Sequence, residues 1–315
     1  MATPSRPELF ERVELTTFPG GWPGSLIRAI EDDGGGVWRT GDYYVEPDRI
    51  IERVRDVGTR GLRLDARDLS FLVRLPELRF LWLATDGRPV LDPIASLANL
   101  EALLIHAGGM RGALDPFALV RLRWLRVSLG GTVGRTIADR LGAGHRNLEW
   151  LSVTEVPHRS IAEIVAGFPS LRHARIHFAD HLRGPGDLAP VAATLRGLEA
   201  DITGLRSLDG LEALGELEVL SLAPIPEGSL ETVAEMPSVR YANLLRRDMS
   251  IEPLRGHPGI RMIWLTDVTP DALAVLETMP QLIAVGGTAP GTSMPWADLR
   301  THEEARAEWF GAIRG

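Results

Sequence analysis

Leucine and other large apolar residues recur along most of the chain in a frame of about 22 residues. Copies of the frame start at Leu69, Leu91 and Leu208, and the second copy continues through Ile94, Leu97, Leu100, Leu103 and Ile105. A three-residue spacing is typical of a helical or 3₁₀ turn, and the closing L-x-L pair indicates a short strand. No such unit can bury its apolar side alone, so neighbouring units must stack. The pattern therefore predicts an α/β solenoid.

The strand segments can be aligned on the apolar residue that opens each of them. These openings are spaced by 21 to 26 residues and fall at Leu78, Leu100, Leu122, Leu148, Leu171, Leu195, Leu217, Val239, Ile260 and Leu282. An earlier, degenerate unit ends in Leu62 and Leu64, which brings the expected number to about eleven. Proline stands two residues before five of the openings, as at Pro76 and Pro237, where it ends the preceding turn.

On these residues the chain resembles the leucine-rich repeat proteins, in the 22-residue class found in internalins and in a regulatory subunit of protein phosphatase 1. The resemblance covers roughly residues 59–288. It implies a horseshoe with a parallel sheet on the concave side, short helices or 3₁₀ turns on the convex side, and a cap at each end. One departure from the family is that the asparagine usual after the L-x-L pair is absent from stretches such as ATDGRPV.

The ends of the chain differ from the repeats and define three expected regions. Residues 1–58 combine strand-like segments with a helix-like PDRIIERVRDVG and are expected to be an N-terminal cap or a small appendage. Residues 59–290 form the solenoid. Residues 291–315 are expected to be a capping helix, with Trp309, Phe310 and Ile313 on its apolar side.

Composition narrows the classes of function. The net charge of −8 and the lack of a basic stripe argue against nucleic-acid and anionic-membrane partners. The absence of cysteine excludes disulfides, thiolate metal sites and cysteine nucleophiles. Neither a signal peptide nor an apolar run of about 18 residues is visible, so we expect a cytoplasmic location.

Every basic side chain other than histidine is arginine, because the chain contains no lysine. A GC-rich bacterial genome is the favoured explanation, and escape from lysine-directed tagging is the alternative. Either way, chemistry that depends on a P-loop, Schiff-base or general-base lysine is excluded.

Side chains alternate along a strand, so the residues between the leucines must point to the concave surface. They fall in three rows that cross the strands. The first row is Phe80, Ala102, Trp124, Trp150, His173, Gly197, Val219, Tyr241, Met262 and Ala284. The second row is Trp82, Leu104, Arg126, Ser152, Arg175, Glu199, Ser221, Asn243, Trp264 and Gly286. The third row is Ala84, His106, Ser128, Thr154, His177, Asp201, Ala223, Leu245, Thr266 and Thr288.

Aromatic side chains on such a surface are typical of binding sites for proteins and peptides. We therefore expect a non-catalytic scaffold whose concave surface binds a protein or peptide, with no cofactor. The expected contact residues are Phe80, Trp82, Trp124, Arg126, Trp150, His173, Arg175, His177, Glu199, Asp201, Tyr241 and Trp264. The alternative for the aromatic residues is that the first row packs against neighbouring strands and is not exposed.

The middle of the rows is charged and leaves two interpretations open. The arginines and histidines there are suited to bind a carboxylate or phosphate of a partner. Alternatively, they form a cross-strand ladder in which Arg175 pairs with Glu199 and His177 with Asp201. A role towards a small molecule or a modified peptide at this patch is the alternative function.

Three further motifs are weighed and set aside. In HARIHFADH, a strand would hold His173 and His177 about 13 Å apart, too far to share one metal ion. Thr154, His177 and Asp201 have the order of a nucleophilic triad, but nothing marks an oxyanion hole. The segment GGTVGRT lacks the residues of a phosphate-binding loop and is better explained by a longer convex helix.

Overall fold

A computed structural model of the chain describes residues 37–39, 47–56, 60–64, 66, 68–85, 87–107, 109–201, 203–226, 228–244, 249–282, 284–289 and 292–298. Within these ranges, thirteen strands form one sheet in the order of the chain. Strands β1 to β12 pair in parallel, and β13 pairs antiparallel to β12. The strands are β1 (Val37–Arg39), β2 (Gly61–Leu64), β3 (Phe80–Thr85), β4 (Ala102–Ala107), β5 (Trp124–Ser128), β6 (Trp150–Thr154), β7 (His173–His177), β8 (Gly197–Asp201), β9 (Val219–Ala223), β10 (Tyr241–Leu244), β11 (Met262–Asp267), β12 (Ala284–Ala289) and β13 (Thr292–Asp298).

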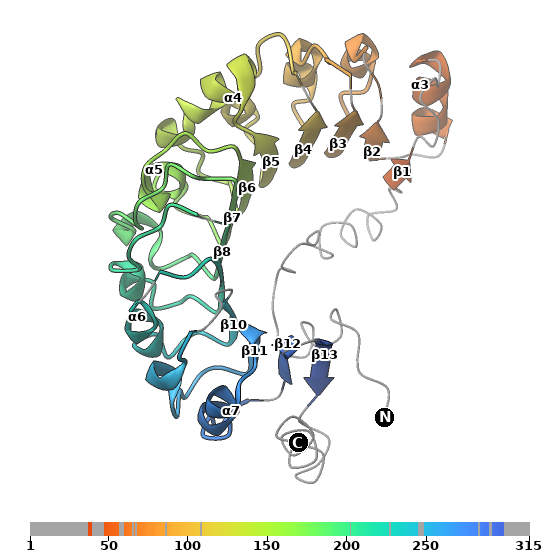
Figure 1. Cartoon of the computed structure of the whole chain (residues 1–315). Helices are drawn as coiled ribbons and strands as arrows, with labels where there is room; N and C mark the ends of the chain where they lie inside the picture. Colours follow the sequence, from red (N-terminus) through yellow and green to blue (C-terminus); the bar gives the residue numbers. More distant parts are fainter. Residues whose placement is uncertain are drawn as a thin grey trace.

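Each connection between parallel strands runs through short helices. The 3₁₀ helices are η1 (Ser70–Arg74), η2 (Asp92–Ser96), η3 (Pro116–Ala118), η4 (Leu141–Ala143), η5 (Ala189–Val191), η6 (Leu211–Ala213) and η7 (Glu252–Leu254). The α-helices are α3 (Pro47–Asp56), α4 (Gly131–Ala138), α5 (Ile161–Val165), α6 (Leu230–Ala234) and α7 (Pro270–Leu276). Figure 1 shows the strands along the inner side of an arc and the helices along its outer side. The chain is thus a leucine-rich repeat solenoid, as the repeated frame predicts.

The three-residue spacing of the leucines matches the hydrogen bonds of the turns. The amide of Leu72 donates to the carbonyl of Leu69, that of Leu75 to Leu72, and that of Leu78 to Leu75, over 2.9–3.2 Å. This i to i−3 pattern brings every third side chain to the same side of the turn, which is why leucine recurs there. The following strand then buries Leu81 and Leu83 against the same core.

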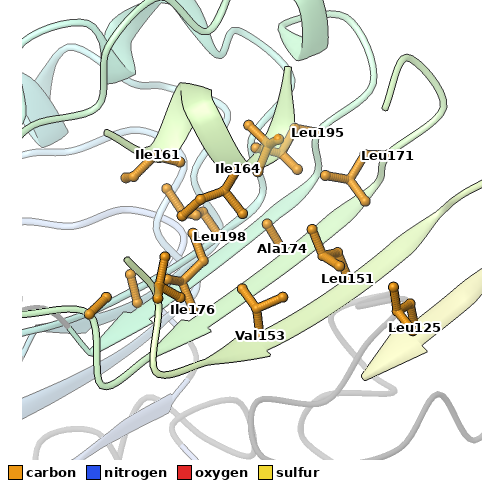
Figure 2. Close-up of a cluster of buried hydrophobic side chains, with 14 of the residues drawn as sticks. Leu125, Leu151, Val153, Ile161, Ile164, Leu171, Ala174, Ile176, Leu195 and Leu198 are labelled. Carbon is orange, nitrogen blue, oxygen red and sulfur yellow. The ribbon is translucent and has the colours of Figure 1, made fainter. Parts of the chain in front are cut away.

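The core is one continuous layer between the sheet and the convex helices. Figure 2 shows its middle, where Leu151 and Val153 of β6 and Ile176 of β7 lie below Ile161 and Ile164 of α5. All five side chains are inaccessible to solvent. Burial of a leucine- or isoleucine-sized side chain stabilises a fold by about 1.5–3 kcal/mol, so the repeated frame supplies the main stabilising term.

The N-terminal part of the described chain continues the solenoid. Helix α3 lies in the segment expected to be helical, and it contributes Ile50, Ile51 and Val54 to the core. Asp48 on α3 also pairs with Arg74 of η1 over 2.7 Å. Strand β1 extends the parallel sheet by one strand beyond β2. The division of the chain at residue 58 stays a prediction, and residues 1–36 lie outside the described part.

The C-terminal end differs from the expected helix. Thr292–Asp298 forms β13, which turns back to pair with β12, so the capping helix expected for residues 291–315 is wrong for this stretch. Strand pairing satisfies the edge of β12, which would otherwise end the sheet with open hydrogen-bonding groups. Trp309, Phe310 and Ile313 lie outside the described residues.

Candidate functional site

The register of the sheet confirms the first two rows predicted for the concave surface. In the first row, Phe80 is the partner of Ala102, and the pairing continues strand by strand to Met262 and Ala284. The second row is also continuous, from Trp82 to Gly286. The third row pairs only in segments, such as Ser128 with Thr154 and Thr154 with His177. At its end, a β-bulge makes Asp267 rather than Thr266 the partner of Thr288.

Most of the first row is buried, which corrects the expectation that its aromatic residues are exposed. Tyr241 and Phe80 are 0% and 1% exposed, Trp150 is 6% exposed and His173 is 7% exposed. On a concave sheet, large side chains on adjacent strands converge and cover one another. The alternative in which the first row packs against neighbouring strands therefore holds for these four residues. Within the row, Trp124 is only half-buried.

A second apolar cluster lies on the face of the sheet that points away from the core. Its buried members are Phe80, Ala102 and Leu104, and Trp82 and Trp124 pack against them while staying half-buried. We call these five residues the tryptophan patch. It spans β3 to β5, which lie side by side along the inner side of the arc (Figure 1), and its two indole rings are partly exposed.

Arginine side chains stack on both indoles of the tryptophan patch. The guanidinium carbon of Arg63 lies 3.9 Å from the ring centroid of Trp82, and that of Arg123 lies 4.4 Å from the ring centroid of Trp124. Such cation–π contacts contribute about 0.5–1 kcal/mol each at exposed sites, and they restrict the ring orientations. The patch is therefore partly ordered before any partner binds.

The middle strands carry a charged group that we call the arginine cluster: Arg126 on β5, Arg175 and His177 on β7, and Glu199 on β8. Arg175 pairs with Glu199 over 3.2 Å, as the ladder interpretation expects. His177 does not pair with Asp201 as expected. Its Nε2 accepts a hydrogen bond from Arg175 Nε and lies 3.8 Å from Glu199. Arg175 and His177 are two residues apart on β7, so their side chains leave the same face of the strand and contact each other.

Burial and neighbouring arginines determine the protonation of this cluster. Burial, followed by the charges of Arg175 and Arg126, lowers the pKa of His177 to about 4. Burial, followed by Arg172, lowers the pKa of His173 to about 3. Both imidazoles are therefore neutral at physiological pH, which agrees with Nε2 of His177 acting as an acceptor. Burial and Arg175 also lower the pKa of Arg126 from its ordinary value.

The remaining predicted contact residues lie at different places on the same face. Asp201 follows Glu199 on β8 and is half-buried in the third row. Trp264 on β11 is half-buried at the far end of the second row, where its register partner is Asn243. Asn243 in turn donates to Ser221 Oγ over 2.9 Å. Trp264 is therefore separated from the tryptophan patch by five intervening strands.

The motifs that were set aside have ordinary structural roles. Thr154 and His177 are register partners, but the contacts of His177 with Arg175 and Glu199 replace the relay that a triad with Asp201 would need. Among the described residues, no three histidine, aspartate or glutamate side chains gather as a metal site requires. The segment around Gly131 begins helix α4, the longer convex helix.

A row of charged residues at the start of the strands was not predicted from the sequence. Each of these residues immediately precedes a strand: Arg79, Glu101, Arg123, Glu149, Arg172, Arg196, Glu218, Arg240 and Arg261. Arg79 holds Glu101 through two hydrogen bonds of 2.7 and 3.1 Å, and Arg123 holds Glu149 through two of 3.0 and 2.8 Å. The two pairs line an open polar pocket of about 460 Å³. The signal in the sequence was the recurrence of arginine or glutamate at one repeat position.

Two buried histidines also have structural roles that the sequence did not indicate. His145 Nε2 lies 3.1 Å from the carbonyl of Leu119 in the preceding repeat. His257 Nδ1 accepts hydrogen bonds from the amides of Gly259 and Ile260, each over 3.1 Å. Both side chains thus satisfy backbone groups in the turns before strands, which makes a ligand-binding role unnecessary to explain them.

Comparisons with known proteins add little beyond the architecture. No family model matches the chain. No curated protein matches it either. Among solved structures, the chain is similar to the functional domain of InlJ from Listeria monocytogenes, which includes a cysteine ladder, with 17% identity and a TM-score of 0.41. The match covers 76% of this chain and 54% of that one, so the chain spans about half the length of that structure. None of the described helices has the length and apolar character that crossing a membrane requires.

Proposed function

We propose that this chain is a non-catalytic scaffold that binds a protein or peptide on its concave surface. The observation that supports the proposal most directly is the tryptophan patch, a cluster of apolar side chains on the sheet face opposite the core. In the described structure, the chain's own helices cover the other face, so this patch is not required to complete the core. Half-buried indoles that are held in place are the side chains that most often dominate binding energy.

The proposed contact surface is narrower than the sequence suggests. Trp82, Trp124 and Trp264 remain in it because their side chains are half-buried and belong to the rows on the sheet face opposite the core. Phe80, Trp150, His173 and Tyr241 move into a supporting role, because their burial leaves almost no surface to contact a partner. Arg126, Arg175, His177, Glu199 and Asp201 form the proposed polar part of the surface.

The extent of the surface favours a protein or an extended peptide over a small ligand. The tryptophan patch begins at β3 and Trp264 lies on β11, so eight inter-strand steps separate the two ends. At about 4.8 Å per step, the path along the curved sheet between the two ends is close to 40 Å. A ligand that follows the sheet from one end to the other must therefore be macromolecular. A bacterial source and a cytoplasmic location stay predictions from composition.

The proposal can be tested by affinity capture with matched variants. Trp124→Ala removes an indole from the tryptophan patch, whereas Val120→Ser changes a residue that is 67% exposed in the turn before β5. Each chain is immobilised after its thermal unfolding has shown that it is folded. Extract of the source organism is then passed over it, and retained proteins are identified by mass spectrometry.

We expect a protein that is retained by the native chain and by Val120→Ser, and that is lost with Trp124→Ala. The reason is that alanine removes most of the area that the indole would bury against a partner, which typically costs about 2 kcal/mol or more, or about thirtyfold in affinity. If all three chains retain the same proteins, the tryptophan patch is not the binding surface and the proposal is wrong.

A further inference from the structure

The arginine cluster has a geometry that a simple cross-strand ladder does not require. Arg126 and Arg175 lie in the same row on β5 and β7, and Ser152 on β6 is the register partner of both. Ser152 is small and only 2% exposed, so neighbouring side chains cover it. Two like charges are thus held about two strand spacings apart on one face of the sheet, with a short hydroxyl side chain between them.

The charges of this arrangement do not balance. Glu199 pairs with Arg175 over 3.2 Å, and the neutral His177 accepts a hydrogen bond from Arg175 and contributes no charge. Arg126 is half-buried and forms no ion pair with an acidic side chain of the described residues. Glu199 and Asp201 both lie three strands away from Arg126, on β8. Arg126 therefore adds a positive charge that has no ion-pair partner among the described residues.

Partial burial of a cation without a counter-charge is unfavourable for the free chain. An anionic group from a partner would remove this unfavourable term and would gain charge-assisted hydrogen bonds from a planar guanidinium. We propose that Arg126 and Arg175 form a receptor site for one carboxylate of the bound peptide. This inference rests on the proposed function and names the chemistry of the partner.

A carboxylate matches the cluster better than a phosphate does. Arg126 contributes a single unpaired positive charge, whereas a phosphate monoester carries about −1.5 to −2 at neutral pH. Glu199 is held beside the site by Arg175 and would repel the additional negative charge. A carboxylate can come from an aspartate or glutamate side chain or from a chain terminus, and both use the same bidentate geometry.

The position of the site also predicts the neighbour of the carboxylate. Trp124 and Arg126 are two residues apart on β5, so their side chains leave the same face about 6.6 Å apart. A peptide that places its carboxylate on Arg126 therefore brings an adjacent side chain over the indole of Trp124. The recognised element is an acidic residue within about two positions of a large apolar residue.

Selection from a library of random peptides tests this inference, because such a selection requires no identified partner. The library is displayed in two forms, one with a free C-terminus and one with the peptide flanked on both sides. Selection is carried out on the native chain, on Arg126→Gln, on Trp124→Ala and on Arg135→Gln. The last variant removes the same charge from an exposed position on the convex helix α4.

We expect peptides selected on the native chain and on Arg135→Gln to be enriched in an acid next to a large apolar residue. Synthetic copies of these peptides should bind Arg126→Gln at least about tenfold more weakly than they bind the native chain. Copies in which glutamine replaces the acid should show the same loss of affinity for the native chain. Enrichment in both library forms indicates a side-chain carboxylate, and enrichment with free C-termini alone indicates a terminal one. Both outcomes support the site.

Other outcomes overturn the inference in distinguishable ways. Apolar enrichment that depends on Trp124, without acidic enrichment, leaves the proposed function intact and shows that the carboxylate site is wrong. The absence of any peptide that prefers the native chain to Trp124→Ala counts against both. A phosphoserine copy that binds the native chain more tightly than the acidic peptide, through Arg126, shows that the ligand is a dianion.

Discussion

Because Arg126 lacks an ion-pair partner among the described residues and Arg175 has one, we expect replacement of each by methionine to change the free energy of unfolding in opposite directions. Arg126→Met keeps much of the aliphatic length of the side chain and removes a half-buried cation that lacks an acidic partner among the described residues. Arg175→Met makes the same change on β7 but leaves Glu199 without its partner at 3.2 Å. The first change should increase the free energy of unfolding, and the second should decrease it.

The magnitudes follow from the spacing of the strands. Arg126 and Arg175 lie two strands apart, or about 10 Å, and two like charges at that distance repel by about 1.7 kcal/mol at an effective dielectric constant of about 20. Flexible side chains and salt reduce this value, so we expect Arg126→Met to stabilise the chain by about 1 kcal/mol. Glu199 is only 19% exposed, and loss of its charged partner should cost about 2 kcal/mol.

Urea denaturation of the native chain and both variants, near neutral pH and low ionic strength, measures the difference. Both substitutions remove the repulsion between the two arginines, and only Arg175→Met loses the pair with Glu199, so the two variants should differ by about 2 kcal/mol. The gap should narrow in about 1 M salt, where the screening length falls to about 3 Å. Equal destabilisation by both substitutions would refute the reasoning, because it would mean that Arg126 stabilises the free chain. It would also remove the main argument for a carboxylate site.

Two further predictions concern the backbone and the buried histidines. Gly144→Ala should lower the free energy of unfolding by more than about 3 kcal/mol, because φ is +71° there and a Cβ would lie 1.8 Å from the carbonyl oxygen of Gly167. Gly131→Ala should lower it by only about 1 kcal/mol, because φ is similar at +69° but the space around a Cβ is open. Equal losses in urea denaturation would contradict the steric argument. Because the pKa values of His173 and His177 are lowered to about 3 and about 4, the unfolded chain takes up protons first as the pH falls below about 6.5, and the free energy of unfolding should fall by up to about 1.4 kcal/mol per pH unit for each histidine. Denaturation between about pH 7 and pH 5 should show a shallower dependence for His177→Gln than for the native chain, and an unchanged slope would show that His177 is not responsible.

The architecture was predictable because the leucine frame is a local signal that is repeated many times. Three-residue spacing corresponds to the i to i−3 hydrogen bonds of the turns, as at Leu72 and Leu75, and the L-x-L pair forms the strand. Alignment of the openings also gave the register of the whole first row. The C-terminal strand was missed because the pairing of Thr292–Asp298 with β12 is antiparallel and has no repeat to indicate it.

The site was predictable as a set of rows but not as a set of exposed or paired side chains. Exposure depends on how far neighbouring strands converge, so Tyr241 is buried and Trp124 is half-buried although both lie in one row. Pairing depends on side-chain reach, so His177 contacts Arg175 on its own strand instead of Asp201 on the next. Both properties are set by the curvature of the sheet and by rotamers, which periodicity does not encode.

The packing of the first row explains why the second row is the better candidate for binding. A Cβ added to Gly197 would lie 2.4 Å from Nδ1 of His173 on the adjacent strand, so the imidazole already occupies the space above the glycine. Side-chain volumes along this row are therefore limited by their neighbours, and a change such as Gly197→Ala would be expressed mainly in stability. The second row lies beside the first on the same face of the sheet, two residues further along each strand, and keeps half-buried groups such as Arg126 and Trp264. Tightly packed, buried side chains thus flank the residues proposed to contact a partner and restrict their movement, which is the arrangement that pre-organised binding surfaces require.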